Sequence, residues 1–190
     1  MNNDELLSAS CTINKNYLPL FTSASNTTWN TAFPENFVYR GKTIYGIAKN
    51  SFNKILTNAN KKYKVVFDAT LAGDKAFYYA FYNCTNLTSI SFPNLVSVGS
   101  YAFSDAFYNC TNLTSVSFPK LISVENSAFS CAFSNCTNLT SVSFPELTAI
   151  TKNAFDLIGH SNLTIHVPSS LSSAGLDTRG TNFGTIVYDL

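Results

Sequence analysis

Cysteines are the residues of this sequence whose spacing most suggests chemistry. Cys84, Cys110 and Cys136 recur every 26 residues, and such a column of thiols could hold metal ions or supply a nucleophile. However, there is no Cys-x-x-Cys motif, and a free cysteine usually packs as a small hydrophobic side chain. We therefore predict that these three thiols are buried. Cys131 falls in a different column, and we expect it to be exposed, with a disulfide to Cys136 open but not favoured.

An acid–base catalytic set has little to draw on. The two histidines, His160 and His166, lie close to the C-terminus, and residues 80–150 contain only four charged residues. A general base needs a nucleophile and an orienting group within reach, and no pattern marks such a set. The alternation of Ile165, His166 and Val167 predicts that His166 points to solvent from a strand. We predict that the protein is not an enzyme and has no catalytic residue, metal site or cofactor.

Asparagine occurs in a recurrent Asn-x-Thr pattern that matches the glycosylation signal. The triplets begin at Asn83, Asn86, Asn109, Asn112, Asn135, Asn138 and Asn162. Because they arise from one segment copied several times, a structural role in turns is favoured over modification.

The composition is unusual for a soluble protein. Of 190 residues only 12% are charged, about half the ordinary fraction, whereas 23 Ser, 20 Thr and 22 Asn supply most of the polar surface. The net charge of +1 is too small for the basic surface that nucleic-acid binding requires. The N-terminal residues lack the basic and apolar segments of a signal peptide, so we expect the chain to be cytoplasmic or virion-borne, or to have lost a leader. No apolar run is long enough to span a membrane.

These residues belong to an internal repeat with a period of 26. Residues 87–112 (LTSISFPNLVSVGSYAFSDAFYNCTN) and 113–138 (LTSVSFPKLISVENSAFSCAFSNCTN) are identical at 18 of 26 positions. A third copy begins at Leu139 and is shortened after Phe155, so that Leu163 follows Leu139 by 24 residues. Residues 61–86 form a degenerate copy whose register is fixed only to within one residue.

Each unit predicts a strand, a turn and a short helix. Ile90 and Phe92 alternate with serine as in a half-buried strand, and Pro93 ends that strand. A doubled Ala-Phe pair then places apolar side chains at i, i+1, i+4 and i+5, which favours about one and a half helical turns. Because one unit cannot bury its apolar residues alone, the copies must stack, with their strands in parallel.

The repeat resembles the BspA-type leucine-rich repeat family. Its strand motif Leu-x-x-Ile-x-Phe fills the L-x-x-L-x-L positions of leucine-rich repeats, and Leu-Thr-Ser-Ile-x-x-Pro followed by Ala-Phe-x-x-Cys is similar to the BspA-type signature. The resemblance covers residues 61–168. It implies an α/β repeat solenoid, a leucine-rich repeat stack with parallel strands on one face and short helical segments on the other. The doubled Ala-Phe pair is a departure that is expected to lengthen the helix.

We predict three regions along the chain. Residues 1–60 form an N-terminal cap, with a worn repeat around Phe37 to Phe52 and a helix over residues 44–60. Residues 61–162 form the repeats. Residues 163–190 form a C-terminal cap, in which LTIHVPSSL is a truncated strand copy and GTIVYDL is the last strand.

Two surfaces are candidate binding sites. The first is a lattice of hydroxyls on the outward strand positions, about 4.8 Å apart along the stack. It comprises Thr88, Ser89, Ser91, Thr114, Ser115, Ser117, Thr140, Ser141 and Ser143. The second is an aromatic patch on the helical side, which could stack on sugars or contact a partner protein. It comprises Tyr78, Tyr79, Tyr82, Tyr101 and Tyr108.

The resemblance implies a non-enzymatic binding or adhesion module of a cell-surface, secreted or phage structural protein. Its expected location is extracellular, at a cell surface or on a virion, and its expected partner is a protein or a glycan. We expect a monomer or a weak homo-oligomer that binds no nucleic acid. One alternative is a structural spacer with an inert hydroxyl face, and a more remote one is an ice-binding lattice.

Overall fold

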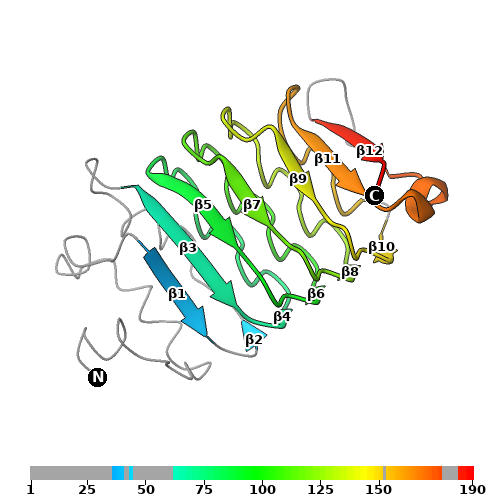
Figure 1. Cartoon of the computed structure of the whole chain (residues 1–190), viewed down its shortest axis with the longest axis horizontal. Coiled ribbons are helices and arrows are strands. Elements are labelled where there is room, and N and C mark those ends of the chain that lie inside the picture. The colour runs from blue at the N-terminus through cyan, green and yellow to red at the C-terminus, as the bar shows by residue number, and fades with distance from the viewer. Residues whose placement is uncertain (1–35, 41–42, 45–61, 152, 177–183) are drawn as a thin grey trace.

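The chain winds into a parallel-strand solenoid of about five coils stacked along one axis (Figure 1). The computed structural model describes residues 36–40, 43–44, 62–151, 153–176 and 184–190, with only the backbone described for 36–40 and 43–44. Each coil has three sides: a strand face of longer strands, a short-strand face, and a turn face. No helix among these residues is long and apolar enough to cross a membrane.

The strand face holds seven strands. They are β1 (Asn36–Arg40), β3 (Tyr63–Asp68), β5 (Leu87–Ser91), β7 (Ser115–Ser117), β9 (Ser141–Ser143), β11 (Thr164–Val167) and β12 (Thr185–Tyr188). All pairs are parallel, which confirms the predicted stacking. The hydrogen-bonded orders are β1-β3-β5-β7 and β9-β11-β12, so the face consists of two sheets.

The short-strand face is one continuous parallel sheet in the order β2-β4-β6-β8-β10. Its two-residue strands are β2 (Thr43–Ile44), β4 (Leu71–Ala72), β6 (Ser97–Val98), β8 (Ser123–Val124) and β10 (Ala149–Ile150). The exposed prolines that follow the long strands turn the chain from one sheet to the other, as expected for a residue that cannot donate to a ladder.

The turn face corrects the predicted helical segments. Residues 74–83, 100–109 and 126–135 form runs of turns, and the described residues contain no α-helix, only the 3₁₀ helix η2 (Ser169–Ala174). Every fourth residue of each run has positive φ; in one run these are Tyr101 (56°), Asp105 (52°) and Asn109 (59°). The Ala-Phe spacing fits a four-residue turn period as well as a helix of 3.6 residues per turn, which explains the wrong interpretation.

Backbone hydrogen bonds show why turns are preferred to a helix on this face. Alternate residues donate back three positions, as Ala80 does to Phe77 at 2.9 Å, and the residues between them donate to the next coil. Phe77 N–H bonds the carbonyl of Ala102 at 2.7 Å, and Phe81 N–H bonds that of Ala106 at 2.9 Å. A helix would use these groups internally and would leave the coils without a ladder here. The doubled Ala-Phe pair therefore lengthens the ladder and does not extend a helix.

Phenylalanine columns fill the interior between the three faces. One column contains Phe77, Phe103, Phe129 and Phe155, a second contains Phe67, Phe92, Phe118 and Phe144, and a third contains Phe81, Phe107 and Phe133. Within a column successive rings stack, at 4.7 Å between the centroids of Phe77 and Phe103. Between columns they meet edge to face, as Phe92 and Phe103 do at 5.0 Å. Both arrangements are favourable for aromatic pairs and add to the burial of apolar area.

The ends of the chain confirm some predictions and leave others untested. β12 pairs with β11, which confirms GTIVYDL as the last strand, and β11 aligns Ile165 with Val142 of β9 as a truncated strand copy should. β3 pairs with β5 through a shift between Tyr63 and Lys64, the one-residue ambiguity of the degenerate copy. Of the predicted 44–60 helix only Ile44 is described, and it lies in β2. The remainder of that helix lies outside the described residues, and the three regional boundaries stay predictions.

A candidate binding groove between β7 and β9

The hydroxyls of the strand face align across neighbouring coils. Ser89 and Ser91 of β5 pair with Ser115 and Ser117 of β7. Their exposure rises along the stack. Thr88, Ser89, Ser91 and Ser117 are half-buried, whereas Thr114, Ser115, Thr140, Ser141 and Ser143 are exposed. The lattice is therefore most accessible around β9.

Two threonines of the lattice hold adjacent coils together. The Thr88 hydroxyl donates to the Tyr63 carbonyl at 3.0 Å, and the Thr114 hydroxyl donates to the Thr88 carbonyl at 3.1 Å. Since each uses its only donor proton within the protein, the serines are left as the main ligand-facing hydroxyls.

The strand face is divided where β7 meets β9. Between β5 and β7, Thr114 N–H bonds the Thr88 carbonyl and Phe92 N–H bonds the Ser117 carbonyl, both at 2.9 Å. The β9–β11 pair has the same two closing bonds, also at 2.9 Å. In the described coils, β9 lies beside β7 without ladder pairing, and neither closing bond, from Thr140 or from Phe118, has a counterpart.

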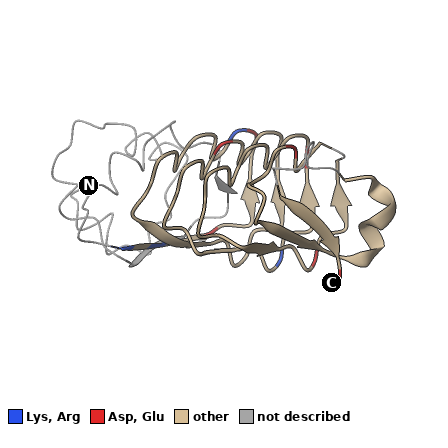
Figure 2. Cartoon of the chain, turned by 90° about the horizontal axis from the view of Figure 1, so that it is seen from above, with Lys and Arg blue, Asp and Glu red and all other residues tan. Residues whose placement is uncertain are grey.

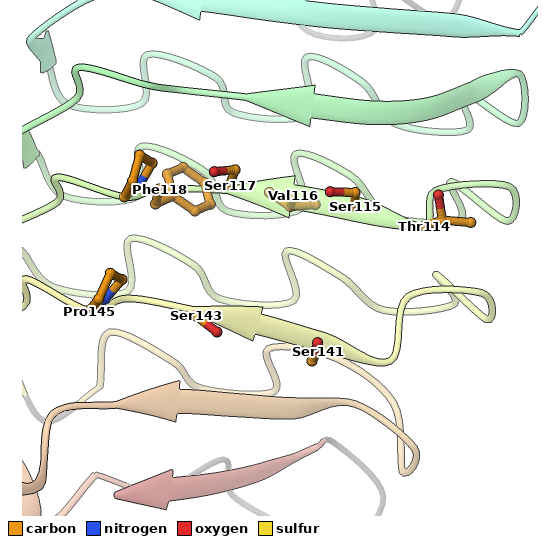
Figure 3. Close-up of a pocket in the computed structure, with 9 residues that line it drawn as sticks. Thr114, Ser115, Val116, Ser117, Phe118, Ser141, Ser143 and Pro145 are labelled. Atoms are coloured by element: carbon orange, nitrogen blue, oxygen red, sulfur yellow. The ribbon is translucent and has the colours of Figure 1, made fainter. Parts of the chain in front are cut away.

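A groove of about 290 Å³ lies at this division. It is lined by Thr114, Ser115, Val116, Ser117, Phe118, Pro119, Ser141, Ser143 and Pro145. Figure 3 shows the hydroxyls along β7 and β9 and the two prolines together at one end. Val116 is 7% exposed where its equivalents Ile90 and Val142 are 1% exposed, so the opening uncovers apolar floor. Five of the nine predicted hydroxyl residues line this groove, and Thr88, Ser89, Ser91 and Thr140 do not.

We attribute the opening to the change of period at the third copy. From β7 to β9 the chain advances 26 residues, but Leu163 follows Leu139 by only 24. β9 pairs with the strand of this shorter coil, and its alignment follows β11 and not β7. The same two coils stay bonded elsewhere, through Ala149 and Ser123 on the short-strand face and through Phe129 and Ala154 on the turn face. The opening is thus local to the strand face.

The groove offers hydrogen bonds and apolar contact without charge. Its residues supply hydroxyls, peptide groups and the Phe118 and proline surfaces, and no titratable side chain lines it. Figure 2 shows how few Lys, Arg, Asp and Glu residues lie along the described coils. Such a surface can accept an uncharged group that exchanges hydrogen bonds with hydroxyls. It provides no acid, base or nucleophile pair for catalysis.

Four of the five tyrosines of the aromatic patch gather on the turn face. Tyr78 meets Tyr79 edge on at 4.5 Å, Tyr79 lies 5.3 Å from Tyr82, and Tyr82 stacks on Tyr108 at 4.9 Å. Tyr101 is 40% exposed. The prediction that some of these rings reach solvent is confirmed, and whether they bind anything stays a prediction.

The predicted cysteine column is buried, as expected. Cys84, Cys110 and Cys136 are free thiols at 0–1% exposure, and the Cys110 and Cys136 thiols contact the carbonyls of Phe81 and Phe107 at 3.1 and 3.0 Å. Burial raises the pKa of all three, that of Cys136 to about 12. Cys131 is also free but half-buried, less accessible than predicted, and burial together with the Asp105 charge raises its pKa.

Histidine and asparagine side chains have structural partners. His166 is 27% exposed on the strand face, where its Nδ1 lies 2.9 Å from the Asp189 carboxylate, and the predicted outward orientation is confirmed. Asn112 and Asn138 donate at 2.7 Å to the carbonyls of Thr85 and Thr111 in the preceding coil. These bonds support the structural interpretation of the Asn-x-Thr segments. Within the described residues no group of three His, Cys, Asp or Glu side chains could hold a metal ion.

The comparison with family models identifies the repeat. A model described as a BspA type leucine rich repeat region of six copies matches residues 74–132 and 104–178, more than half of the chain. The chain belongs to the BspA-type leucine-rich repeat family. Leucine-rich repeat modules of this type are generally non-enzymatic, typically mediate protein interactions and are often surface-associated. Searches of curated proteins and of solved structures gave no match.

Sequence reasoning found the hydroxyls but missed the opening between them. The strand motifs of the second and third copies are nearly identical, so nothing within them indicates that β7 and β9 separate. The available signal was the 24-residue interval after Leu139, which showed that the following coil could not keep the same geometry.

Proposed function

We propose that this BspA-type protein is a non-enzymatic binding or adhesion module of a cell-surface, secreted or virion-associated protein. Its ligand is an uncharged segment of a partner protein that docks on the strand face at the β7–β9 groove. The observation that carries this proposal is the break in the hydrogen-bonded ladder. It is the one place on the described strand face where peptide groups, exposed serines and an apolar floor meet in a concave surface.

A protein partner is favoured over a glycan at this groove. Sugar sites use aromatic faces, whereas this groove has hydroxyls, prolines and the edge of Phe118. Peptide segments can use the hydroxyls and unpaired backbone groups as donors and acceptors, in the manner of edge recognition. The groove is small, so it fits a loop tip or one side chain with its flanking peptide groups.

An ice-binding lattice has less support. Regular spacing over several coils is the feature that such a lattice needs, and the β7–β9 division interrupts it. The half-buried hydroxyls of β5 further reduce the flat exposed area.

Screening the labelled chain on arrays of peptides and glycans tests the proposal. Ser115→Arg and Ser141→Arg each place a bulky charge over the groove and should weaken binding of any peptide hit at least about tenfold, since a desolvated charge costs about 1.4 kcal/mol or more. Thr148→Arg is the matched control, because Thr148 is equally exposed but lies outside the groove. It should leave the affinity unchanged.

Two results would overturn this function. If no array member binds at millimolar concentration, the spacer alternative replaces it. If binding is confined to glycans, or is unaffected by both arginine substitutions, the ligand class or the groove is wrong.

A further inference from the structure

The turn face carries a second cluster, which the groove does not explain. Tyr78, Tyr79, Tyr82 and Tyr108 form a connected set of rings across two coils. All four are half-buried, so each presents part of its ring to solvent. Tyrosine clusters of this kind are enriched at binding sites because large rings supply contact area at low entropic cost.

One carboxylate lies within this cluster. Asp105 occupies the position of Tyr79 in the next coil, and its side chain accepts a hydrogen bond from the Ser104 hydroxyl at 3.1 Å. Asp105 is also hydrogen-bonded to Tyr79, and burial together with this neighbouring charge raises the pKa of the Tyr79 phenol. In the part of the chain that the structure describes, no lysine or arginine forms an ion pair with Asp105.

The cluster is rigidly mounted. Tyr79 N–H bonds the Ser104 carbonyl at 3.2 Å, and Asp105 N–H bonds the Ser130 carbonyl at 2.9 Å, so both residues are fixed by inter-coil bonds. Tyr108 N–H bonds the Asp105 carbonyl at 3.3 Å. Since the backbone and the stacked rings are set before a ligand arrives, binding would order little additional structure.

The charge around the cluster favours a cation. The described turn segments 73–84, 99–110, 125–136 and 153–160 carry four acidic residues and one basic residue. These are Asp74, Asp105, Glu125, Asp156 and Lys75. A cationic ligand is therefore attracted to the same face that presents the rings.

We propose that the cluster formed by Tyr78, Tyr79, Tyr82, Tyr108 and Asp105 binds the guanidinium group of an arginine side chain on a protein partner. A guanidinium is planar, stacks on aromatic faces and presents two parallel donors to a carboxylate. A lysine ammonium gains less from stacking, and a neutral sugar gains nothing from the Asp105 charge. The site lies on a different side of the coil from the β7–β9 groove and does not depend on it.

An NMR titration of the full chain with Nα-acetyl-arginine amide tests the site. Tyrosine ring signals of the cluster should shift with millimolar affinity, and the uncharged citrulline counterpart should produce no comparable shift. Asp105→Asn keeps a residue type that tolerates positive φ and should weaken binding about fivefold, as should Tyr82→Leu. Glu146→Gln removes an equally negative, exposed side chain elsewhere and serves as the control. Raising the salt concentration should weaken binding.

The outcomes separate this site from its competitors. The proposal is overturned if citrulline amide binds as well as arginine amide, if Asp105→Asn has no more effect than Glu146→Gln, or if the rings do not respond at about 50 mM ligand. Shifts caused by a neutral methyl glycoside alone would assign the rings to a sugar instead. Ser141→Arg should leave arginine binding intact, whatever its effect at the groove.

Discussion

The strand face and the turn face are built by the same repeat, yet they respond differently when the repeat changes length. At the shortened third copy, the strand face loses its ladder between β7 and β9. The turn face keeps bonding across the same two coils, through Phe129 to Ala154 at 2.9 Å, Cys131 to Asp156 at 3.1 Å and Phe133 to Ile158 at 2.6 Å.

The difference arises from how each face distributes its inter-coil bonds. A turn run offers an outward N–H at every second residue over ten positions, and local three-residue bonds hold those groups in place. β7 and β9 are three residues long, so one misaligned pair removes most of their ladder. A surface opening is therefore expected where a short strand meets a change of period, and a rigid surface where turns continue.

The largest expected effect comes from the interior that the two faces share. Phe103 contacts rings on every side, and we expect Phe103→Ala to lower the free energy of unfolding by about 3–5 kcal/mol. Phe118→Ala should lie at the lower end of that range, because Phe118 borders the groove and its site can relax. Urea unfolding of the two variants measures the difference. A larger cost at Phe118 would contradict the contrast between the faces.

Alkaline pH should destabilise the thiol column behind the turn face. Burial holds the folded-state pKa of Cys136 near 12, against 9.0 for the ordinary thiol, so the unfolded state loses its proton first. Stability should be level below about pH 8 and should fall between pH 9 and 12, by about 1.4 kcal/mol per pH unit for each such thiol. Cys136→Ala should reduce that slope by one thiol's share in urea titrations at several pH values. An unchanged slope would contradict a buried neutral Cys136.

A glycine substitution distinguishes the turn run from a helix. Ser127 has φ of 51°, so Ser127→Gly should be more stable than Ser127→Ala by about 0.5–1 kcal/mol, because glycine adopts this conformation without strain. In a helix the order would reverse, since alanine exceeds glycine by about 1 kcal/mol. Thermal denaturation of the pair decides between the two geometries.

The smallest effect is expected for the exposed hydroxyls themselves. Ser141→Arg should change the free energy of unfolding by no more than about 0.5 kcal/mol, like Thr148→Arg, because both side chains are exposed. Urea unfolding of both variants shows whether a loss of binding at Ser141 can be separated from a loss of fold. A much larger cost for Ser141→Arg would mean that this serine supports the fold.

Periodicity in the sequence predicted most of the stack. The 26-residue spacing of Leu, Phe and Cys fixes which side chains share a column, and alternation around Ile90 and Val116 fixes which of them point inward. The turn face was mistaken for helix because Ala102, Phe103, Ala106 and Phe107 satisfy both geometries. Asn83, Asn109 and Asn135, a residue type that tolerates positive φ, were the signal for turns.

The candidate sites depended on relations that one repeat unit does not contain. The groove requires the geometry of three successive coils, and the Tyr79–Asp105 contact joins residues 26 positions apart in neighbouring coils. Aligning the copies brings Tyr79 and Asp105 into one column, but only the stacked structure shows that the carboxylate lies among the rings.

Amide hydrogen exchange, followed residue by residue by NMR, tests the division of the strand face most directly. Thr140 and Phe118 should exchange at least about tenfold faster than their equivalents Thr114 and Phe92, which are bonded at 2.9 Å, while Phe129 and Phe133 on the turn face stay protected. Equal protection of Thr140 and Thr114, and of Phe118 and Phe92, would contradict an open groove between β7 and β9.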